Sequence, residues 1–545
     1  MNTRATEVFD YVIVGAGSAG CVLAHRLSED AGTRVVVLEA GGPDRDPWIH
    51  IPLGWVKILM ERRHDWGYSF GPEPHVDGRR IECARGKVLG GSSSTNAMAH
   101  VRGHPGDFAR WARSGLEDWS YAHVLPYFKR AETWEKGADA YRGGTGPLWV
   151  RESRYADPLI EAYIEAGRAA GYPTGVDYNG RDSFGFFRVQ QTVKNGRRHS
   201  AAAAYLKPVL HRPNLALRMH ALVTRIVFER GRAVGVEFAH DGATRVIRAE
   251  REVLLAGGVV NSPQLLMLSG VGPERELRAH GLETLVDRPA VGQNLQDHAS
   301  AIVDYHRTAP GPFHRRMRFD RLALDIPRAY LAGTGPATDF PSGLTAFLKT
   351  EPGLAVPDIQ FLARAVPVGA RPWFPGIRPA WRDGFGCRAV LLHPESRGCV
   401  ALTAADPRAP VRLQGNFFTA GKDVRTLRAG LKLAREISAA SALDPFRADE
   451  LAPGRDVKSD AALDAFIRQQ MITVHHPAGT CRMGADDASV VDPKLRVRGV
   501  DGLRVVDASV MPDLVSGNIN ATVIMIAERA ADLIRGRTPL APTAV

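Results

Sequence analysis

A glycine-rich turn near the N-terminus constrains the fold of this chain more than any other feature. Residues 11–14 form a continuous apolar, β-branched run that leads directly into GAGSAG at 15–20. Such a run is typical of a strand buried on both faces of a parallel sheet. Residues 21–27 have helical character, and 33–38 form a second apolar run. The pattern predicts a strand, a tight turn, a helix and a second strand.

The same stretch predicts a dinucleotide site. Glycines let the backbone turn sharply and approach a pyrophosphate at the helix N-terminus, and an acidic residue after the second strand accepts from ribose hydroxyls and disfavours NADP. GxGxxG alone is weak evidence, because glycine turns also serve packing, but the complete pattern favours a dinucleotide, either NAD or FAD. The candidate contacts are Gly15, Gly17, Ser18, Ala19, Gly20, Glu39 and Ala40.

A second loop, RGKVLGGSSSTNAM at 85–98, is dense in glycine and small hydroxyl residues. Such a loop brings backbone N–H groups close to a planar or anionic ligand. A surface linker is the alternative, but flexible linkers rarely carry interleaved apolar residues. We therefore favour a cofactor loop, with candidate contacts at Val88, Gly91, Asn96, Ala97 and Met98.

Together these loops resemble the glucose-methanol-choline (GMC) family of FAD-dependent oxidoreductases. The resemblance continues through 256–273 and through VGQNLQDH at 291–298, and it covers essentially the whole chain. It implies an FAD cofactor, with Val223 beside the adenine and Asp507 and Ala508 at a further FAD contact. It also implies an α/β (α+β) fold of two domains: a Rossmann-like FAD-binding domain and a substrate domain whose antiparallel sheet is covered by helices.

The length of 545 residues also predicts more than one domain, because a single hydrophobic core rarely serves so long a chain. The resemblance implies a discontinuous FAD-binding domain of residues 1–155, 215–310 and 470–545. Residues 156–214 and 311–469 then form the substrate-binding domain. Apolar runs at 358–362, 388–392 and 399–402 are predicted strands of its sheet.

The predicted catalytic residues lie near the C-terminus, in HHPAGTCRMG at 475–484 and SGNINA at 516–521. In the family, the histidine before Pro-x-Gly-Thr faces the flavin, which implies His476. The partner, His or Asn among relatives, is placed at Asn520, forty-four residues later. Alcohol oxidation removes a hydroxyl proton and transfers a hydride to flavin N5, so a base that titrates near neutrality suits His476. Asn520, which cannot titrate, is predicted to orient the substrate oxygen.

Two positions differ from some members of the family. Thr95 stands where certain choline-oxidising members carry a histidine bonded to the flavin, so noncovalent FAD is predicted. His475 stands where several primary-alcohol and hydroxymethylfurfural oxidases have a bulky or aromatic residue; it either shapes the substrate pocket or simply packs. No aromatic cage that would require a choline substrate is evident.

The predicted function is oxidation of a primary alcohol to an aldehyde by a GMC-type alcohol oxidase or dehydrogenase, with O2 or a quinone-like or artificial compound as electron acceptor. A choline-type dehydrogenase, a hydroxynitrile-lyase-like flavoprotein without net redox chemistry and a noncatalytic flavoprotein are the alternatives. The particular alcohol, the acceptor and the oligomeric state stay open.

Charge and cysteine usage exclude other classes. The formal charge of +11 comes from scattered arginines, which indicates a solvated basic surface and no nucleic-acid partner. Five widely spaced cysteines lack metal-ligand spacing, so neither a disulfide framework nor a metal site is predicted. No separate apolar leader precedes the first strand and no run of eighteen apolar residues occurs, so a cytoplasmic location without a membrane span is predicted.

Overall fold

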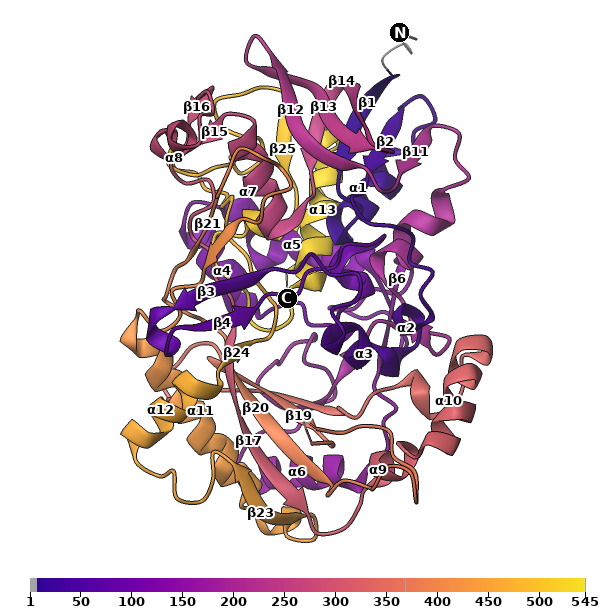
Figure 1. Ribbon diagram of the computed structural model, residues 1–545, viewed down its shortest axis with the longest axis vertical. Helices are drawn as coiled ribbons and strands as arrows, with labels where there is room; N and C mark the ends of the chain where they lie inside the picture. Colours follow the sequence, from indigo (N-terminus) through magenta and orange to yellow (C-terminus); the bar gives the residue numbers. More distant parts are fainter. Residues whose placement is uncertain (1–6, 368, 545) are drawn as a thin grey trace.

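The computed structural model describes residues 7–367 and 369–544, and it contains two seven-stranded sheets (Figure 1). The two sheets lie toward opposite ends of the long axis of the molecule, and helices cover both. This confirms the predicted mixed α/β fold. Among the described residues, no helix combines the length and apolar character needed to cross a membrane.

The first sheet has the order β11-β2-β1-β14-β13-β12, and β25 pairs with β14. The strands at its centre are parallel, and β12, β13 and β14 form an antiparallel meander. Every residue of β2 is buried, as expected for a strand covered on both faces. The strands are β1 (Glu7–Val14), β2 (Val35–Leu38), β11 (Leu215–Arg218), β12 (Leu222–Glu229), β13 (Arg232–His240), β14 (Ala243–Leu255) and β25 (Leu503–Val505).

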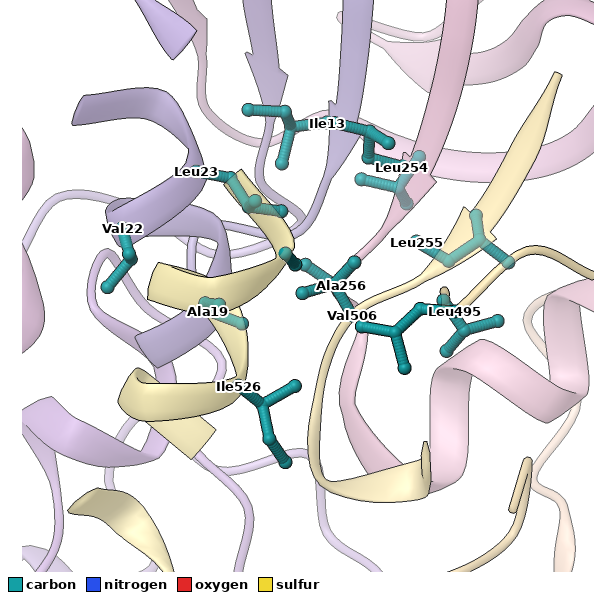
Figure 2. Close-up of a cluster of buried hydrophobic side chains, with 14 of the residues drawn as sticks. Ile13, Ala19, Val22, Leu23, Leu254, Leu255, Ala256, Leu495, Val506 and Ile526 are labelled. Carbon is teal, nitrogen blue, oxygen red and sulfur yellow. The ribbon is translucent and has the colours of Figure 1, made fainter. Parts of the chain in front are cut away.

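Two helices from opposite ends of the chain pack together on this sheet. Figure 2 shows Leu23 of α1 (Ser18–Leu27) and Ile526 of α13 (Asn520–Ile534) in one buried cluster with Ile13 and Leu254 of the sheet. An ion pair of 2.9 Å between Arg26 of α1 and the fully buried Glu528 of α13 adds to this packing. The N-terminus of α13 is thereby held against the glycine turn at the start of α1.

The second sheet is antiparallel, with the order β23-β17-β20-β19-β18-β7, and β24 pairs with β17. Helix α11 (Gly421–Ser438) packs on β17, β19 and β20, and α6 (Pro158–Ala169) packs on β7 and β18. The strands are β7 (Gly185–Arg188), β17 (Ala299–Arg307), β18 (Leu344–Leu348), β19 (Ile359–Arg364), β20 (Gly384–Leu391), β23 (Arg447–Ala452) and β24 (Ile472–Thr473).

One predicted strand lies in a different sheet from the predicted one. The predicted strand at 399–402 is β21 (Cys399–Ala401), which pairs outside the substrate-side sheet, with β22 (Arg412–Gln414). That pair joins β3 (Ser69–Glu73) and β4 (Arg79–Glu82) in a separate four-stranded sheet. Strands β17 and β24 both belong to the second sheet, because β17 pairs with β20 from Ser300 to His306 and with β24 at Ala299 and Ser300. The domain boundaries at 310 and 470 stay predictions.

The remaining elements connect and cover these sheets. The other helices are α2 (Pro47–His50), α3 (Trp55–Met60), α4 (Pro105–Arg113), α5 (Tyr121–Ala131), α7 (Gly258–Leu268), α8 (Glu274–Ala279), α9 (Pro312–Arg316), α10 (Phe319–Ala332) and α12 (Asp460–Gln470). Short strands form three small sheets: β5 (Glu132–Trp134), β6 (Leu148–Glu152) and β8 (Gln190–Gln191); β9 (Val193–Lys194) and β10 (Arg197–Arg198); and β15 (Val271–Gly272) and β16 (Val286–Asp287).

Candidate active site

A cavity of about 1260 Å³ is lined by residues from both seven-stranded sheets. Pockets for a single small ligand usually measure roughly 300–1,000 Å³, so this cavity has room for a dinucleotide and a small substrate. The predicted catalytic and pocket residues His475, His476 and Asn520 line it. So do most of the predicted cofactor contacts: Gly15, Gly17, Ser18, Ala19, Glu39, Ala40, Gly91, Asn96, Ala97, Met98, Val223, Asp507 and Ala508.

Gly20 and Val88, the other two predicted cofactor contacts, do not line the cavity. A Cβ at Gly20 would lie 1.9 Å from the carbonyl oxygen of Gly15, so this glycine allows the helix to approach the turn. Val88 is fully buried and packs against Ile49 and Ile58. Both residues support the loops that surround the cavity.

The glycine loops fit a dinucleotide. Gly15 has a φ of +100°, and a Cβ there would lie 2.6 Å from the carbonyl oxygen of Ala256. A Cβ at Gly91 would lie 2.8 Å from the Cα of Gly17, so the two loops meet at backbone distance. No side chain caps the N-terminus of α1. Its first N–H groups are therefore available to an anionic pyrophosphate.

Glu39 stands at the end of β2, in the position that fits a ribose. Its carboxylate accepts hydrogen bonds from the backbone N–H of Ala16 (2.8 Å) and of Gly41 (2.7 Å). Burial raises the pKa of Glu39, and these two donors oppose the rise. The carboxylate therefore fixes both flanking loops, and its remaining lone pairs suit ribose hydroxyls.

His476 is held between the sheets by backbone pairing. The short strand β24 pairs with β17, and the chain then leads through Val474 and His475 to His476. The side chain of His476 is 8% exposed and lines the cavity. Its Nδ1 lies 3.0 Å from Nδ1 of His298, and its Nε2 lies 3.0 Å from Nδ2 of Asn518. Burial, and next the neighbouring His298, hold the pKa of His476 well below its usual value, so the ring is neutral near pH 7.

The hydrogen-bond partners determine which nitrogen of His476 carries the proton. Nε2 of His298 lies 3.1 Å from the carbonyl oxygen of Leu392, which can only accept, so Nε2 must be the protonated nitrogen. Burial lowers the pKa of His298 to about 3, so the ring is neutral and its Nδ1 is an acceptor. The facing Nδ1 of His476 must then donate. This leaves a lone pair on Nε2 of His476, toward the amide of Asn518.

Asp297 connects the backbone segment that carries His298 to the segment that carries His476. Its Oδ1 accepts from the backbone N–H of His298 (2.8 Å) and of His476 (2.8 Å). The carboxyl group is buried, and burial raises its pKa to about 7. Asp297 therefore fixes the backbone on both sides of the histidine contact.

The amide beside His476 differs from the predicted one. The sequence places Asn520 there, but the structure places Asn518 against Nε2 of His476. Asn520 is the first residue of α13, and its Oδ1 accepts a hydrogen bond of 2.6 Å from the Ser18 hydroxyl in the glycine turn. The difference follows from the helix boundary, since Asn518 lies just before the helix and reaches a different part of the cavity.

His475 lines the cavity but has other partners. It adopts a left-handed backbone conformation (φ 62°), its Nδ1 accepts from the backbone N–H of Ala84 (3.3 Å), and its carbonyl oxygen accepts from Arg85. Burial, and next Arg85 and Arg388, lower its pKa to about 3, so it is neutral near pH 7. His475 joins the second glycine-rich segment to the segment that carries His476.

Two residues of this arrangement were missed in the sequence. His298 ends the VGQNLQDH loop, a stretch that resembles the family but does not by itself indicate a role for this histidine. Asn518 lies two residues before the predicted Asn520. The helical run that begins near 521 in the sequence indicates that Asn518 lies outside the helix.

Comparison with known proteins identifies the family of this chain. The family model described as GMC oxidoreductase matches residues 9–300, and its C-terminal counterpart matches residues 394–527. An oxygen-dependent choline dehydrogenase of Brucella ovis is 44% identical over 536 residues, covering 98% of this chain and 96% of that protein.

Solved structures agree in fold. Pyridoxine 4-oxidase from Mesorbium loti is 34% identical, with a TM-score of 0.87, and the match covers 97% of this chain and 100% of that one. A variant formate oxidase of Aspergillus oryzae RIB40, from work on its FAD modification, is 26% identical with a TM-score of 0.88, covering 98% and 99%. With its dinucleotide loops and its histidine site in one cavity, this chain belongs to the GMC family of FAD-binding oxidoreductases.

Proposed function

We propose that this enzyme oxidises a primary alcohol to an aldehyde, with Nε2 of His476 as the base that accepts the hydroxyl proton. The observation that carries the proposal is the chain of hydrogen bonds from the Leu392 carbonyl through His298 to Nδ1 of His476. This chain places the ring proton of His476 on Nδ1 and leaves the lone pair of Nε2 at the cavity. A neutral imidazole held in one tautomer is suited to general-base catalysis. FAD, when bound, supplies the acceptor for the hydride of the carbinol carbon.

Asn518 is the proposed orienting residue in place of Asn520. Its Nδ2 lies 3.0 Å from Nε2 of His476 and uses the lone pair of that nitrogen. A substrate hydroxyl that replaces this contact from the cavity side would accept from the amide and donate to the imidazole. Proton transfer makes His476 cationic, and His298 still accepts from its Nδ1. The charge that develops on the imidazole is therefore stabilised by a group already in place.

The relatives suggest a second candidate substrate and an acceptor. The 44% identity to oxygen-dependent choline dehydrogenase makes choline a candidate alcohol and O2 a candidate acceptor. The relatives reported above are oxidases or dehydrogenases by name, which favours net oxidation over the lyase alternative.

The test is reduction of the bound flavin by a panel of primary alcohols, including choline, in the absence of oxygen. A productive alcohol should bleach the flavin absorbance, and admitting air while peroxide is measured tests O2 as acceptor. His476→Ala should slow bleaching by a factor of about 10² to 10⁴, the usual contribution of a general base. FAD content and melting temperature serve as controls for folding. Bleaching at the unmodified rate in His476→Ala would contradict the assigned base.

A further inference from the structure

The substrate side of the cavity carries a guanidinium group that has no anionic partner. Arg388 lies on β20 and lines the cavity. Within the described part of the chain it forms no ion pair, and one terminal nitrogen (Nη1) donates a hydrogen bond to the hydroxyl of Ser300 (3.1 Å). Burial, and next the charge of Arg364, lower the pKa of Arg388 to about 10, so it stays charged near pH 7.

The neighbouring charges leave Arg388 available for a ligand. Asp304 is the nearby carboxylate, and Arg364 on β19 already neutralises it through hydrogen bonds of 2.6 and 2.5 Å to its two oxygens. A buried charge is costly unless an opposite charge or several hydrogen bonds compensate it. Arg388 is half-buried, and no carboxylate of the described residues pairs with it, so an anionic ligand would supply the missing opposite charge.

Arg388 is also close to the reacting centre. Strand β20 pairs with β17, and the Ser300 hydroxyl that accepts from Arg388 donates in turn to the carbonyl oxygen of Ile472 (2.8 Å). Ile472 lies on β24, four residues before His476. The positive charge of Arg388 also contributes to the lowered pKa of His475, the residue beside the proposed base.

The remaining charges of the cavity do not suit a cationic substrate. Four carboxylates line the cavity, and each already has partners. Glu39 and Asp507 accept hydrogen bonds at the nucleotide loops. Asp65 accepts from the backbone N–H of Arg85 and Gly67, and Glu61 pairs with Lys57 and Arg63. Trp66, the aromatic residue next to Asp65, has Lys87 over its ring at 4.5 Å. A quaternary ammonium group would thus find no unpaired carboxylate among these four.

We propose that Arg388, positioned by Ser300, is an anion-binding subsite that recognises a carboxylate on the substrate, so that the preferred alcohols are hydroxy acids whose hydroxyl reaches His476. The guanidinium fork matches a carboxylate in geometry and charge. This inference rests on the proposed alcohol oxidation and names its substrate class.

The experiment compares ω-hydroxycarboxylates of increasing length with their methyl esters and with choline, using anaerobic flavin bleaching by the FAD-loaded enzyme. We expect at least one acid to exceed its ester in kcat/KM by tenfold or more, and choline to be poorer than both. Arg388→Gln should lower kcat/KM for the acid by about 10- to 100-fold, mainly through KM, and leave the ester nearly unchanged. Arg315→Gln removes the same charge from an exposed site and should leave the acid-to-ester ratio unchanged.

Two results would overturn the subsite: choline as the preferred substrate, or equal losses for acid and ester in Arg388→Gln. A second measurement separates this proposal from the proposed reaction. Straight-chain carboxylates without a hydroxyl cannot react, but they should perturb the spectrum of the oxidised flavin in the unmodified enzyme and not in Arg388→Gln. Carboxylate binding without any alcohol oxidation would keep the subsite and refute the reaction, whereas equal binding by both proteins would refute the subsite.

Discussion

His298 provides the sharpest test of how this site works, because it contacts His476 and does not line the cavity. In His298→Leu, Nδ1 of His476 loses its acceptor. The proton can then move to Nε2, where Oδ1 of Asn518, which has no hydrogen-bond partner in the described structure, would accept it after a flip of the amide. The lone pair that receives the substrate proton would be lost.

The size of the effect follows from the lost hydrogen bond. His476 becomes a cation in the reaction, and a hydrogen bond from a charged group contributes about 1.5–3 kcal/mol. Since 1.36 kcal/mol corresponds to a factor of ten in rate, His298→Leu should slow flavin reduction about 10- to 150-fold. KM should change little, because His298 does not line the cavity.

His298→Asn is the matched variant. Both substitutions remove the hydrogen bond to the Leu392 carbonyl, but the Asn side chain carries an oxygen near the position of Nδ1 that can accept from His476. Stopped-flow anaerobic bleaching should therefore show a large loss in His298→Leu and recovery of most of the rate in His298→Asn. Equal losses in the two variants would refute the tautomer role and indicate a general packing defect, which FAD content and melting temperature would reveal independently.

Three further predictions concern other parts of the site. Asn518→Ala should slow flavin reduction by about 10- to 100-fold, the effect expected for loss of a hydrogen bond to a developing charge. Asn520→Ala should instead weaken the retention of FAD after dilution. The reverse pattern would restore Asn520 as the orienting residue. With Thr95 in place of a linking histidine, acid precipitation should release all FAD into the supernatant, and yellow colour in the pellet would contradict noncovalent binding. Burial raises the pKa of Asp297 from 3.8 to about 7. Between these pH values the folded chain keeps the carboxyl proton that the unfolded chain has lost. The contribution of this proton to the free energy of unfolding therefore falls as the pH rises from about 4 to about 7. Asp297→Asn keeps an acceptor for both backbone N–H groups and should flatten this fall in a series of melting temperatures against pH; an unchanged pH dependence would contradict the raised pKa.

Local patterns predicted the strands and the helix around the nucleotide loops. The strand, turn, helix and second strand at 7–38 form as expected, because apolar periodicity and glycine placement depend on neighbours in sequence. Even here the role of single residues depends on packing. Gly20 and Val88 belong to the predicted loops, yet they face the protein interior. The sequence identifies such a loop, but only the folded structure shows which of its residues reach the ligand.

The charges of the cavity depend entirely on tertiary pairing. Scattered arginines predict a solvated basic surface, and no sequence pattern distinguishes Arg364 from Arg388, which lie on adjacent strands and point into the same cavity. What separates them is Asp304 on β17, which is sixty residues from Arg364 in sequence and, within the described residues, forms its ion pair with Arg364. A substitution of Asp304 should therefore convert Arg364 into a second unpaired cation. If net charge determines carboxylate affinity on this side of the cavity, Asp304→Asn should strengthen carboxylate binding in the flavin spectral titration. Unchanged or weaker binding would show that the geometry of Arg388 and Ser300 matters more than the net charge.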